Sequence, residues 1–389
     1  MNLIKIGNFD WPESRWEDSK SVFNHIYLIQ RDDVIENKFD WVELISLSKY
    51  GSLKNRLNSL LFILLEYLIN YVFLYNIVVS LFRFLNNKSL NKIKNLNSNQ
   101  VYSSYNDYDR SDHLTVILLP YLRDKYIVRA IKETRPDFRY PEFLCLLKSN
   151  AIILNSKFNL KFFENKYNTD FSGKRIYFNL DEDWRSKRFI TNLLIAEKKS
   201  KTDNLKHFVI LSGRVFSELG NLRSGARQYY IKLIQEIIDL GQHIDLYTGE
   251  IVLTSSGLNL YSELEKKSNG LFKIKGLLDF KNQPLESYAI LSRYDFGILH
   301  NFEENQKVSY FDKFNIPNRF YEYQISGVLP IVKKNDSFVV EEIIEKNNCG
   351  VVYVKLIDLL QCKTSKYKAY NPTFEDYCIT LKKIFNFEI

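Results

Sequence analysis

Short apolar runs alternate with longer segments of helical periodicity along most of this chain. Such runs, bounded by turn residues, predict buried strands, and strands that alternate with helices are typical of parallel sheets built from βαβ units. The alternation forms two series, which predicts two doubly wound α/β domains. The expected strands lie at residues 3–6, 25–29, 42–47, 114–118, 151–154 and 175–178 in the first series, and at 207–211, 244–247, 272–274, 296–299, 328–332 and 351–354 in the second.

A polar stretch between the two series predicts the domain boundary. Residues 197–204 read Glu-Lys-Lys-Ser-Lys-Thr-Asp-Asn, a composition that suits a solvated connection. Two domains also agree with the length of 389 residues, because single cores stop growing at about 250–300 residues. We therefore expect a first domain over residues 1–190, a second over residues 205–370, and a division near residues 190–205.

A loop with several arginines follows the first strand of the second series. Ser212, Gly213 and Arg214 are expected to end that strand, and the helical pattern of residues 226–238 starts after the loop. Loops of this kind lie at the carboxyl end of an open α/β sheet, where ligands bind. A guanidinium can bind a diphosphate through two hydrogen bonds, and a helix N-terminus adds partial positive charge. The predicted diphosphate ligands are Gly213, Arg214, Arg223 and Arg227, and the alternative is three solvated arginines on a surface loop.

A helix predicted at about residues 317–326 carries the second candidate site. Asn318, Arg319 and Glu322 share one of its faces by their i, i+3, i+4 spacing. A carboxylate one turn into such a helix can accept hydrogen bonds from ribose hydroxyls. The spacing alone fits equally well an exposed pair of Arg319 with Glu322, worth about 0.2–0.5 kcal/mol.

The segment Pro-Asn-Arg-Phe-Tyr-Glu-Tyr-Gln-Ile-Ser-Gly-Val-Leu-Pro, residues 317–330, resembles the Pro-Asn/Ser-Lys-x-x-Glu-Tyr-x-x-x-Gly-x-Pro segment of GT-B glycosyltransferases. In that family the Glu, here Glu322, binds the ribose of the donor, and the residue at Arg319 is usually Lys. Ser-Gly-Arg at residues 212–214 resembles the family's Gly-Arg, whose Arg contacts the donor phosphates. The similarity extends over residues 140–355.

The resemblance is to retaining, nucleotide-sugar-dependent enzymes of glycosyltransferase families one and four. It implies a GT-B fold, in which two Rossmann-like domains face each other across a cleft and the last segment, residues 371–389, packs back on the first domain. It also implies that a sugar is transferred from a nucleotide-diphosphate donor to a hydroxyl of a glycan or lipid-linked acceptor, without a metal or a cofactor, in the synthesis of a cell-envelope polysaccharide. Two departures matter. The family's Lys after Gly-Arg is absent, with Arg223 or Arg227 as its expected substitute, and Phe314 stands where a second Glu is common, which leaves the anomeric outcome open.

The sequence selects no general base. Asp10, Asp109 and His113 lie in the first domain, but no spacing argument distinguishes them. The four cysteines and five histidines lack metal-ligand spacing, and the Asp-x-Asp sequences at residues 107–109 and 181–183 read as solvated turns, so no metal site is expected. Two other functions stay open: a nucleotide-sugar 2-epimerase-like enzyme on the same fold, and a non-catalytic GT-B-like scaffold at a membrane surface.

Residues 57–85 form a long apolar stretch that predicts a helix with two buried faces. On a helical projection the polar residues fall within an arc of about 140°, which leaves about 220° apolar, whereas one-sided packing needs only about 100°. We expect one face to pack on its own domain and the other on a membrane surface or a partner, with a fully internal helix as the alternative. Glu66 disfavours a membrane-spanning helix, because a charge at mid-helix costs about 2.5–3.5 kcal/mol. Lys49, Lys54 and Arg56 are placed to meet anionic headgroups.

The net charge of +8 and the pI of about 8.9 change this picture little. A modest basic excess suits an anionic partner such as a nucleotide diphosphate or an anionic lipid surface, and a nucleic-acid partner is not expected. The first residues lack the basic-then-apolar order of a signal peptide. We therefore expect a cytoplasmic protein, with residues 57–85 as the segment that would hold it on the inner face of the cytoplasmic membrane.

Overall fold

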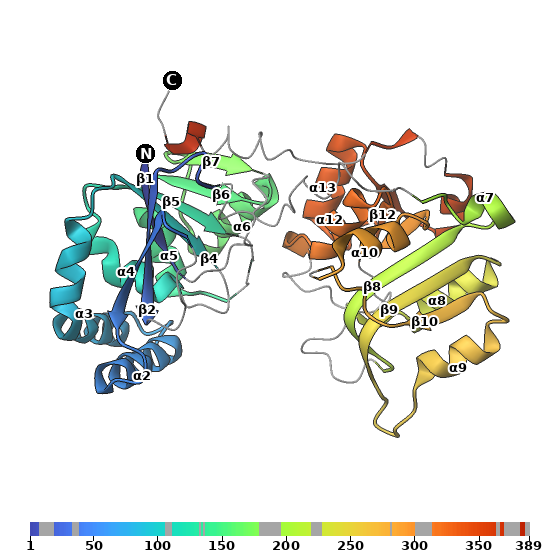
Figure 1. Ribbon diagram of the computed structural model, residues 1–389, viewed down its shortest axis with the longest axis horizontal. Coiled ribbons are helices and arrows are strands. Elements are labelled where there is room, and N and C mark those ends of the chain that lie inside the picture. The colour runs from blue at the N-terminus through green and yellow to red at the C-terminus, as the bar shows by residue number, and fades with distance from the viewer. Residues whose placement is uncertain are drawn as a thin grey trace. The chain divides into compact units, whose positions relative to one another are not determined.

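A computed structural model describes residues 1–7, 19–32, 39–105, 111–131, 134, 137–178, 196–218, 228–280, 282–299, 313–362, 366–368 and 382–385. The chain divides into two compact units: unit 1, Met1–Glu182 with Phe374–Ile389, and unit 2, Asp183–Thr373. Each unit contains one parallel sheet with associated helices, as Figure 1 shows. The prediction of two Rossmann-like α/β sheets is therefore confirmed, while the expected boundary at residues 190–205 falls partly outside the described residues.

Unit 1 contains a seven-stranded sheet in the order β3-β2-β1-β4-β5-β6-β7. All of its strand pairs are parallel. The strand order reverses direction between β1 and β4, and open α/β sheets bind their ligands beyond the carboxyl ends of the strands at such a switch point. The strands are β1 Asn2–Ile6, β2 His25–Asp32, β3 Val42–Ser48, β4 Gln100–Tyr105, β5 Tyr126–Ile131, β6 Ala151–Leu154 and β7 Arg175–Phe178.

One expected strand of unit 1 is a helix, and two of its strands were not expected. The apolar run at residues 114–118 belongs to α4 Ser111–Leu118, every residue of which is buried. A short apolar run does not by itself separate a buried strand from a buried helix. The unexpected strands are β4 and β5, whose apolar pattern is interrupted by Ser103 and Arg129. These two polar side chains are buried and hydrogen-bond to each other, and Arg129 also pairs with the carboxylate of Asp112.

The single helix predicted over residues 57–85 is in fact two helices, α2 Leu53–Tyr67 and α3 Val72–Lys94. They are antiparallel, because Asn58 near the start of α2 exchanges amide hydrogen bonds with Asn86 near the end of α3. A single straight helix over both segments would be about 60 Å long, about twice the width of a seven-stranded sheet. The reversal lets both helices bury an apolar stripe on the same core.

The end of the chain belongs to unit 1. Phe385 accepts a hydrogen bond at its carbonyl oxygen from Gln100 Nε2 (2.9 Å), and its ring lies 5.7 Å from the ring of Phe23. Of the expected C-terminal segment, residues 371–389, the structure describes residues 382–385. The other helices of unit 1 are α5 Tyr140–Lys148, α6 Lys157–Tyr167 and the 3₁₀ turn η1 Leu119–Tyr121.

Unit 2 contains a six-stranded parallel sheet in the order β10-β9-β8-β11-β12-β13, with its switch point between β8 and β11. All six strands expected in the second half of the chain are present. The strands are β8 His207–Phe216, β9 His243–Val252, β10 Phe272–Lys275, β11 Phe296–Ile298, β12 Leu329–Lys333 and β13 Val351–Tyr353. The helices are α7 Ser200–Asp203, α8 Ile231–Asp239, α9 Leu260–Lys267, α10 Pro284–Leu291, α12 Asn318–Ile325, α13 Phe338–Asn347 and the 3₁₀ helix η4 Leu356–Gln361.

Candidate functional site

The carboxyl ends of β8 and β9 extend beyond the rest of the unit 2 sheet. β8 pairs with β9 as far as Phe216 and Val252, whereas its pairing with β11 stops at Ile210. The two long neighbouring arrows of β8 and β9 are visible in Figure 1. The expectation that the strand ends at residues 212–214 is therefore wrong, because backbone pairing with β9 carries it on as a two-stranded ribbon.

Arg214 lies on this ribbon, directly opposite Glu250 in the register of β8 and β9. Its Nε donates a hydrogen bond to Glu250 Oε2 (2.6 Å), and both side chains are about half exposed. An exposed ion pair contributes only about 0–1 kcal/mol, so a more highly charged anion can compete with the carboxylate for the guanidinium. Gly213, the preceding residue, leaves open space where a side chain would stand. Arg223 and Arg227 lie outside the described residues.

The N-terminal turn of α12 meets the carboxyl end of the buried part of β8 through Arg319. Its Nη1 donates hydrogen bonds to the Leu211 carbonyl oxygen (2.7 Å) and to the Tyr230 hydroxyl (3.0 Å). The alternative of an exposed surface pair with Glu322 is therefore wrong, because the Arg319 guanidinium is turned toward β8. Leu211 directly precedes Ser212, so this contact brings the two predicted motifs to one edge of one sheet.

Glu322 and Asn318 occupy different environments on α12. Glu322 is buried, at 9% exposed, whereas Asn318 at the first position of the helix is exposed. The next residue, Tyr323, holds the helix in place: its hydroxyl accepts a hydrogen bond from the Leu211 N–H (3.0 Å), and burial raises its pKa. A side chain at Gly297 would collide with the Tyr323 ring, so glycine is needed there. These contacts fix the first turn of α12 at the carboxyl edge of the sheet.

Asp203, His207 and His243 form a cluster at the opposite, amino edge of the unit 2 sheet that could hold a metal ion. His207 begins β8, His243 begins β9, and their rings stack 4.7 Å apart. Asp203 Oδ2 lies 2.9 Å from His207 Nε2 and 3.9 Å from His243 Nε2. Burial and the neighbouring His207 lower the pKa of His243, which favours the neutral imidazole that binds metals. The spacing of the histidines along the chain does not predict this cluster, because the pairing of β8 with β9 brings His207 and His243 together.

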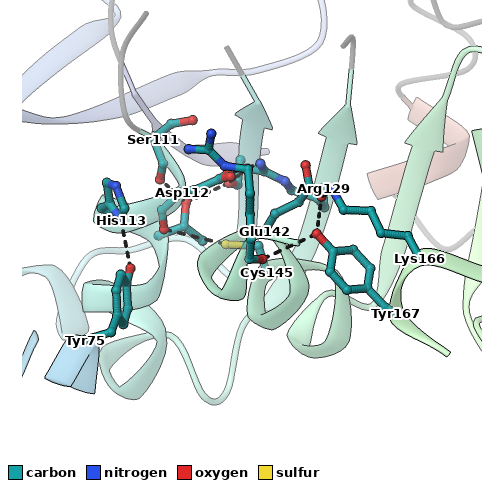
Figure 2. A network of polar contacts seen from close by, with 12 residues as sticks. Tyr75, Ser111, Asp112, His113, Arg129, Glu142, Cys145, Lys166 and Tyr167 are labelled. Carbon is teal, nitrogen blue, oxygen red and sulfur yellow. Dashed lines mark hydrogen bonds and ion pairs between the residues drawn. The ribbon is translucent and has the colours of Figure 1, made fainter. Parts of the chain in front are cut away.

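Unit 1 holds a network of buried charged side chains where β4 and β5 meet α4 and α5, shown in Figure 2. Arg129 is fully buried and donates hydrogen bonds to Ser103 Oγ (2.7 Å) and to the carboxylate of Asp112, in the first turn of α4. Glu142 on α5 is also fully buried and accepts a hydrogen bond from Lys166 Nζ (2.6 Å). Buried charges need such partners, and each of these has one inside the unit. The network therefore fixes the helices on the sheet.

His113 is the general-base candidate that falls within the described residues, whereas Asp10 and Asp109 lie outside them. Its Nδ1 lies 2.9 Å from the Tyr75 hydroxyl and its Nε2 lies 2.8 Å from Glu66 Oε2. The hydrogen bond with His113 lowers the pKa of Glu66 to about 2. The order hydroxyl, imidazole, carboxylate resembles a catalytic triad, but Tyr75 is fully buried and burial raises its pKa. Since both ring nitrogens of His113 have protein partners, this chain of contacts ties the α2–α3 hairpin to α4.

No protein-family model matches the chain, and no curated protein matches it by sequence. Solved structures match over its whole length. The N-terminal domain of the trehalose-6-phosphate phosphatase of Candida albicans aligns with 100% of this chain and 97% of its own, at 10% identity and a TM-score of 0.56. Sucrose-phosphate synthase from Thermosynechococcus elongatus aligns over 99% of this chain and 98% of its own, at 9% identity and a TM-score of 0.51. At these identities the similarity establishes a shared fold, in agreement with the predicted pair of Rossmann-like sheets.

Proposed function

We propose that this protein is a glycosyltransferase that moves a sugar from a nucleotide-diphosphate donor to a hydroxyl of a glycan or lipid-linked acceptor, without a metal. The observation that carries the proposal is the hydrogen bond from Arg319 to the Leu211 carbonyl oxygen. It ties residues 317–330 to Leu211, the residue that directly precedes residues 212–214. Each of these two segments resembles a donor-binding segment of GT-B glycosyltransferases. They meet at the carboxyl edge of a parallel sheet beside its switch point, where such sheets bind ligands.

In this proposal the donor lies with its diphosphate toward Arg214 and its ribose toward Glu322. Arg214 leaves Glu250 and binds the diphosphate, with Arg223 and Arg227 as further cations and the backbone at Gly213 allowing close approach. The bond between the anomeric carbon and the diphosphate breaks, and the acceptor oxygen forms the new bond and loses its proton. A guanidinium placed where negative charge grows on the leaving diphosphate stabilises the transition state.

The ion pair between Arg214 and Glu250 supports a second candidate, a non-catalytic protein with the same fold. If the donor does not displace the carboxylate, Arg214 serves only the β8–β9 ribbon. An enzyme of the 2-epimerase type would use the same donor site but would need no acceptor. The three functions differ in what they do to a nucleotide sugar: transfer, conversion, or nothing.

A thermal-shift panel of nucleotide sugars is the first experiment. A donor at 100 times its dissociation constant should stabilise the protein by about 2.7 kcal/mol, and the free nucleotide diphosphate should stabilise it as well. The donor that binds is then incubated with the protein, with and without glycan and lipid-linked acceptors, and the products are identified by mass spectrometry. Transfer supports the proposal, isomerised donor supports the epimerase, and a panel without any stabilising nucleotide sugar supports the scaffold.

The proposed cellular place is the cytoplasm, at the inner face of the membrane. A lipid-linked acceptor is presented at a membrane surface, and unit 1 carries a surface that suits such a place, the outward face of the α2–α3 hairpin. In the described residues, none of the helices is both long enough and apolar enough to cross a bilayer.

A further inference from the structure

The α2–α3 hairpin has a second apolar face, directed away from the core. Most of the exposed large apolar side chains in the described part of the chain lie in residues 50–85. Some are almost entirely in solvent: Leu53 is 83% exposed, Tyr67 77%, Phe73 76% and Phe84 80%. Single exposed apolar residues are ordinary, but a concentration of them on two paired helices is typical of an interaction site.

This outward face adds nothing to the core of unit 1. The core uses the opposite stripe of each helix, where Phe62 packs edge-on against Phe82 with ring centroids 5.4 Å apart. Leu65 and Tyr75 are fully buried in the same cluster. The acidic side chain of the hairpin, Glu66, also contacts the interior of unit 1, where it hydrogen-bonds to His113. The outward apolar side chains therefore serve something other than folding of this unit.

The charges around this face favour an anionic surface as its partner. The antiparallel pairing of α2 with α3 places the start of α2 beside the end of α3. Exposed basic side chains from both helices therefore gather at one end of the hairpin: Lys54 and Arg56 from α2, and Lys88, Lys92 and Lys94 from α3. Between residues 44 and 100 the sequence contains one acidic residue, Glu66.

We propose that the α2–α3 hairpin lies flat on a bilayer that contains anionic lipid, with its outward apolar side chains at the level of the acyl-chain boundary. Phe73 and Phe84 enter the bilayer, and Lys54, Arg56 and Lys88 contact the headgroups. Apolar burial and attraction to anionic lipid together give amphipathic helices their surface affinity. The proposal rests on the hairpin alone and holds whether or not the unit 2 site transfers a sugar.

The test is flotation of the full-length protein with two kinds of vesicle, pure phosphatidylcholine and phosphatidylcholine with about a third phosphatidylglycerol. We expect the parent protein to float with the anionic vesicles and to bind them less in about 0.5 M salt, which screens the headgroup charge. Phe73→Ser with Phe84→Ser should lower the partition coefficient by about tenfold or more, because two large apolar side chains no longer leave water. Lys88→Glu with Lys92→Glu should abolish the preference for anionic vesicles.

Val354→Ser with Ile357→Ser is the matched control, since both residues are exposed apolar side chains of unit 2, at 62% and 53%. This control should float like the parent. All four hairpin positions in the test variants are exposed, so each variant should keep the thermal unfolding midpoint of the parent. Three results would overturn the proposal: no flotation of the parent with anionic vesicles, equal flotation of the Phe73/Phe84 variant, or a concentration-dependent dimer of the parent, seen by light scattering, that this variant dissolves. The last result would identify a second copy of the chain as the partner.

Discussion

Arg214 and Glu322 face different parts of the proposed donor, so their loss should affect different steps. Charge grows on the diphosphate as the sugar leaves, so Arg214→Ala should lower kcat more than it weakens nucleotide binding. The ribose is unchanged by the reaction, so Glu322→Ala should weaken donor and free nucleotide equally, by about 1–3 kcal/mol for a charged hydrogen bond. The expected kinetic signature is a raised KM with a smaller change in kcat.

The measurements are steady-state kinetics and nucleotide titration by calorimetry. Because Glu322 is buried, Glu322→Gln is included as a variant of the same shape, and the unfolding midpoint of each variant is recorded. Glu250→Gln is the matched control for Arg214: it frees the guanidinium, so nucleotide diphosphate should bind at least as tightly as in the parent. If Glu322→Ala binds the donor as well as the parent does, the ribose assignment is wrong.

The pH dependence of folding should show the contact between Glu66 and His113. The pKa of Glu66 is lowered to about 2 in the folded protein, so its stabilising effect is full above the ordinary pKa of Glu, about 4.3, and is lost as the pH falls from there toward 2. The carboxylate is partly exposed, so we expect a contribution of only about 1 kcal/mol. In urea unfolding, Glu66→Gln should be less stable than the parent at pH 7, and the difference should shrink toward pH 3. Glu345→Gln, an exposed position on α13, is the control and should match the parent at both pH values.

Among the secondary-structure elements of unit 1, β5 and α4 are held together by a buried ion pair. Removing one partner leaves the other charge buried and uncompensated, which costs about 3–5 kcal/mol. Arg129→Met should therefore destabilise unit 1 by that amount in urea unfolding, because Asp112 stays buried without its ion-pair partner. Arg129→Met combined with Asp112→Leu should recover most of the loss, because apolar replacements of both partners are often neutral.

Lys92→Met, an exposed position on α3, serves as the control for the loss of one positive charge and should stay within about 0.5 kcal/mol of the parent. A double variant that is no more stable than Arg129→Met would show that shape, rather than charge pairing, decides the stability at this point.

For the molecule as a whole, the proposed donor site and the proposed membrane face lie in different units. Mutational effects at sites without shared partners add. The Phe73→Ser with Phe84→Ser variant should therefore lose vesicle binding and keep the full thermal shift with the nucleotide sugar. Glu322→Ala should keep vesicle binding and reduce the thermal shift with the nucleotide sugar. Thermal shift and flotation are measured on the same preparations. A variant that loses both vesicle binding and nucleotide-sugar binding would show that the two surfaces are coupled.

The architecture of unit 2 could be predicted almost entirely from the sequence. The central strands β8, β11 and β12 contain continuous buried apolar runs, the simplest pattern that sequence carries, whereas the edge strands β10 and β13 are only partly buried. The strands of unit 1 are harder to predict. Ser103 and Arg129 interrupt the pattern of β4 and β5, and they are tolerated inside because the fold pairs them with each other and pairs Arg129 with Asp112. The run at residues 114–118 was misread because periodicity alone does not distinguish a short buried helix from a buried strand.

The sequence by itself determined which residue types stand at the candidate donor site, and the tertiary structure decided what they contact. The spacing of Arg319 and Glu322 fits a surface pair, but α12 packs so that Arg319 reaches the Leu211 carbonyl of another element. The excess of apolar residues over 57–85 was readable as a second apolar face, yet only the reversal between α2 and α3 brought basic residues from both ends of that segment together. Side-chain periodicity is local and is written in the sequence, whereas strand register and helix pairing join residues far apart in the chain, and only packing of the whole unit determines them.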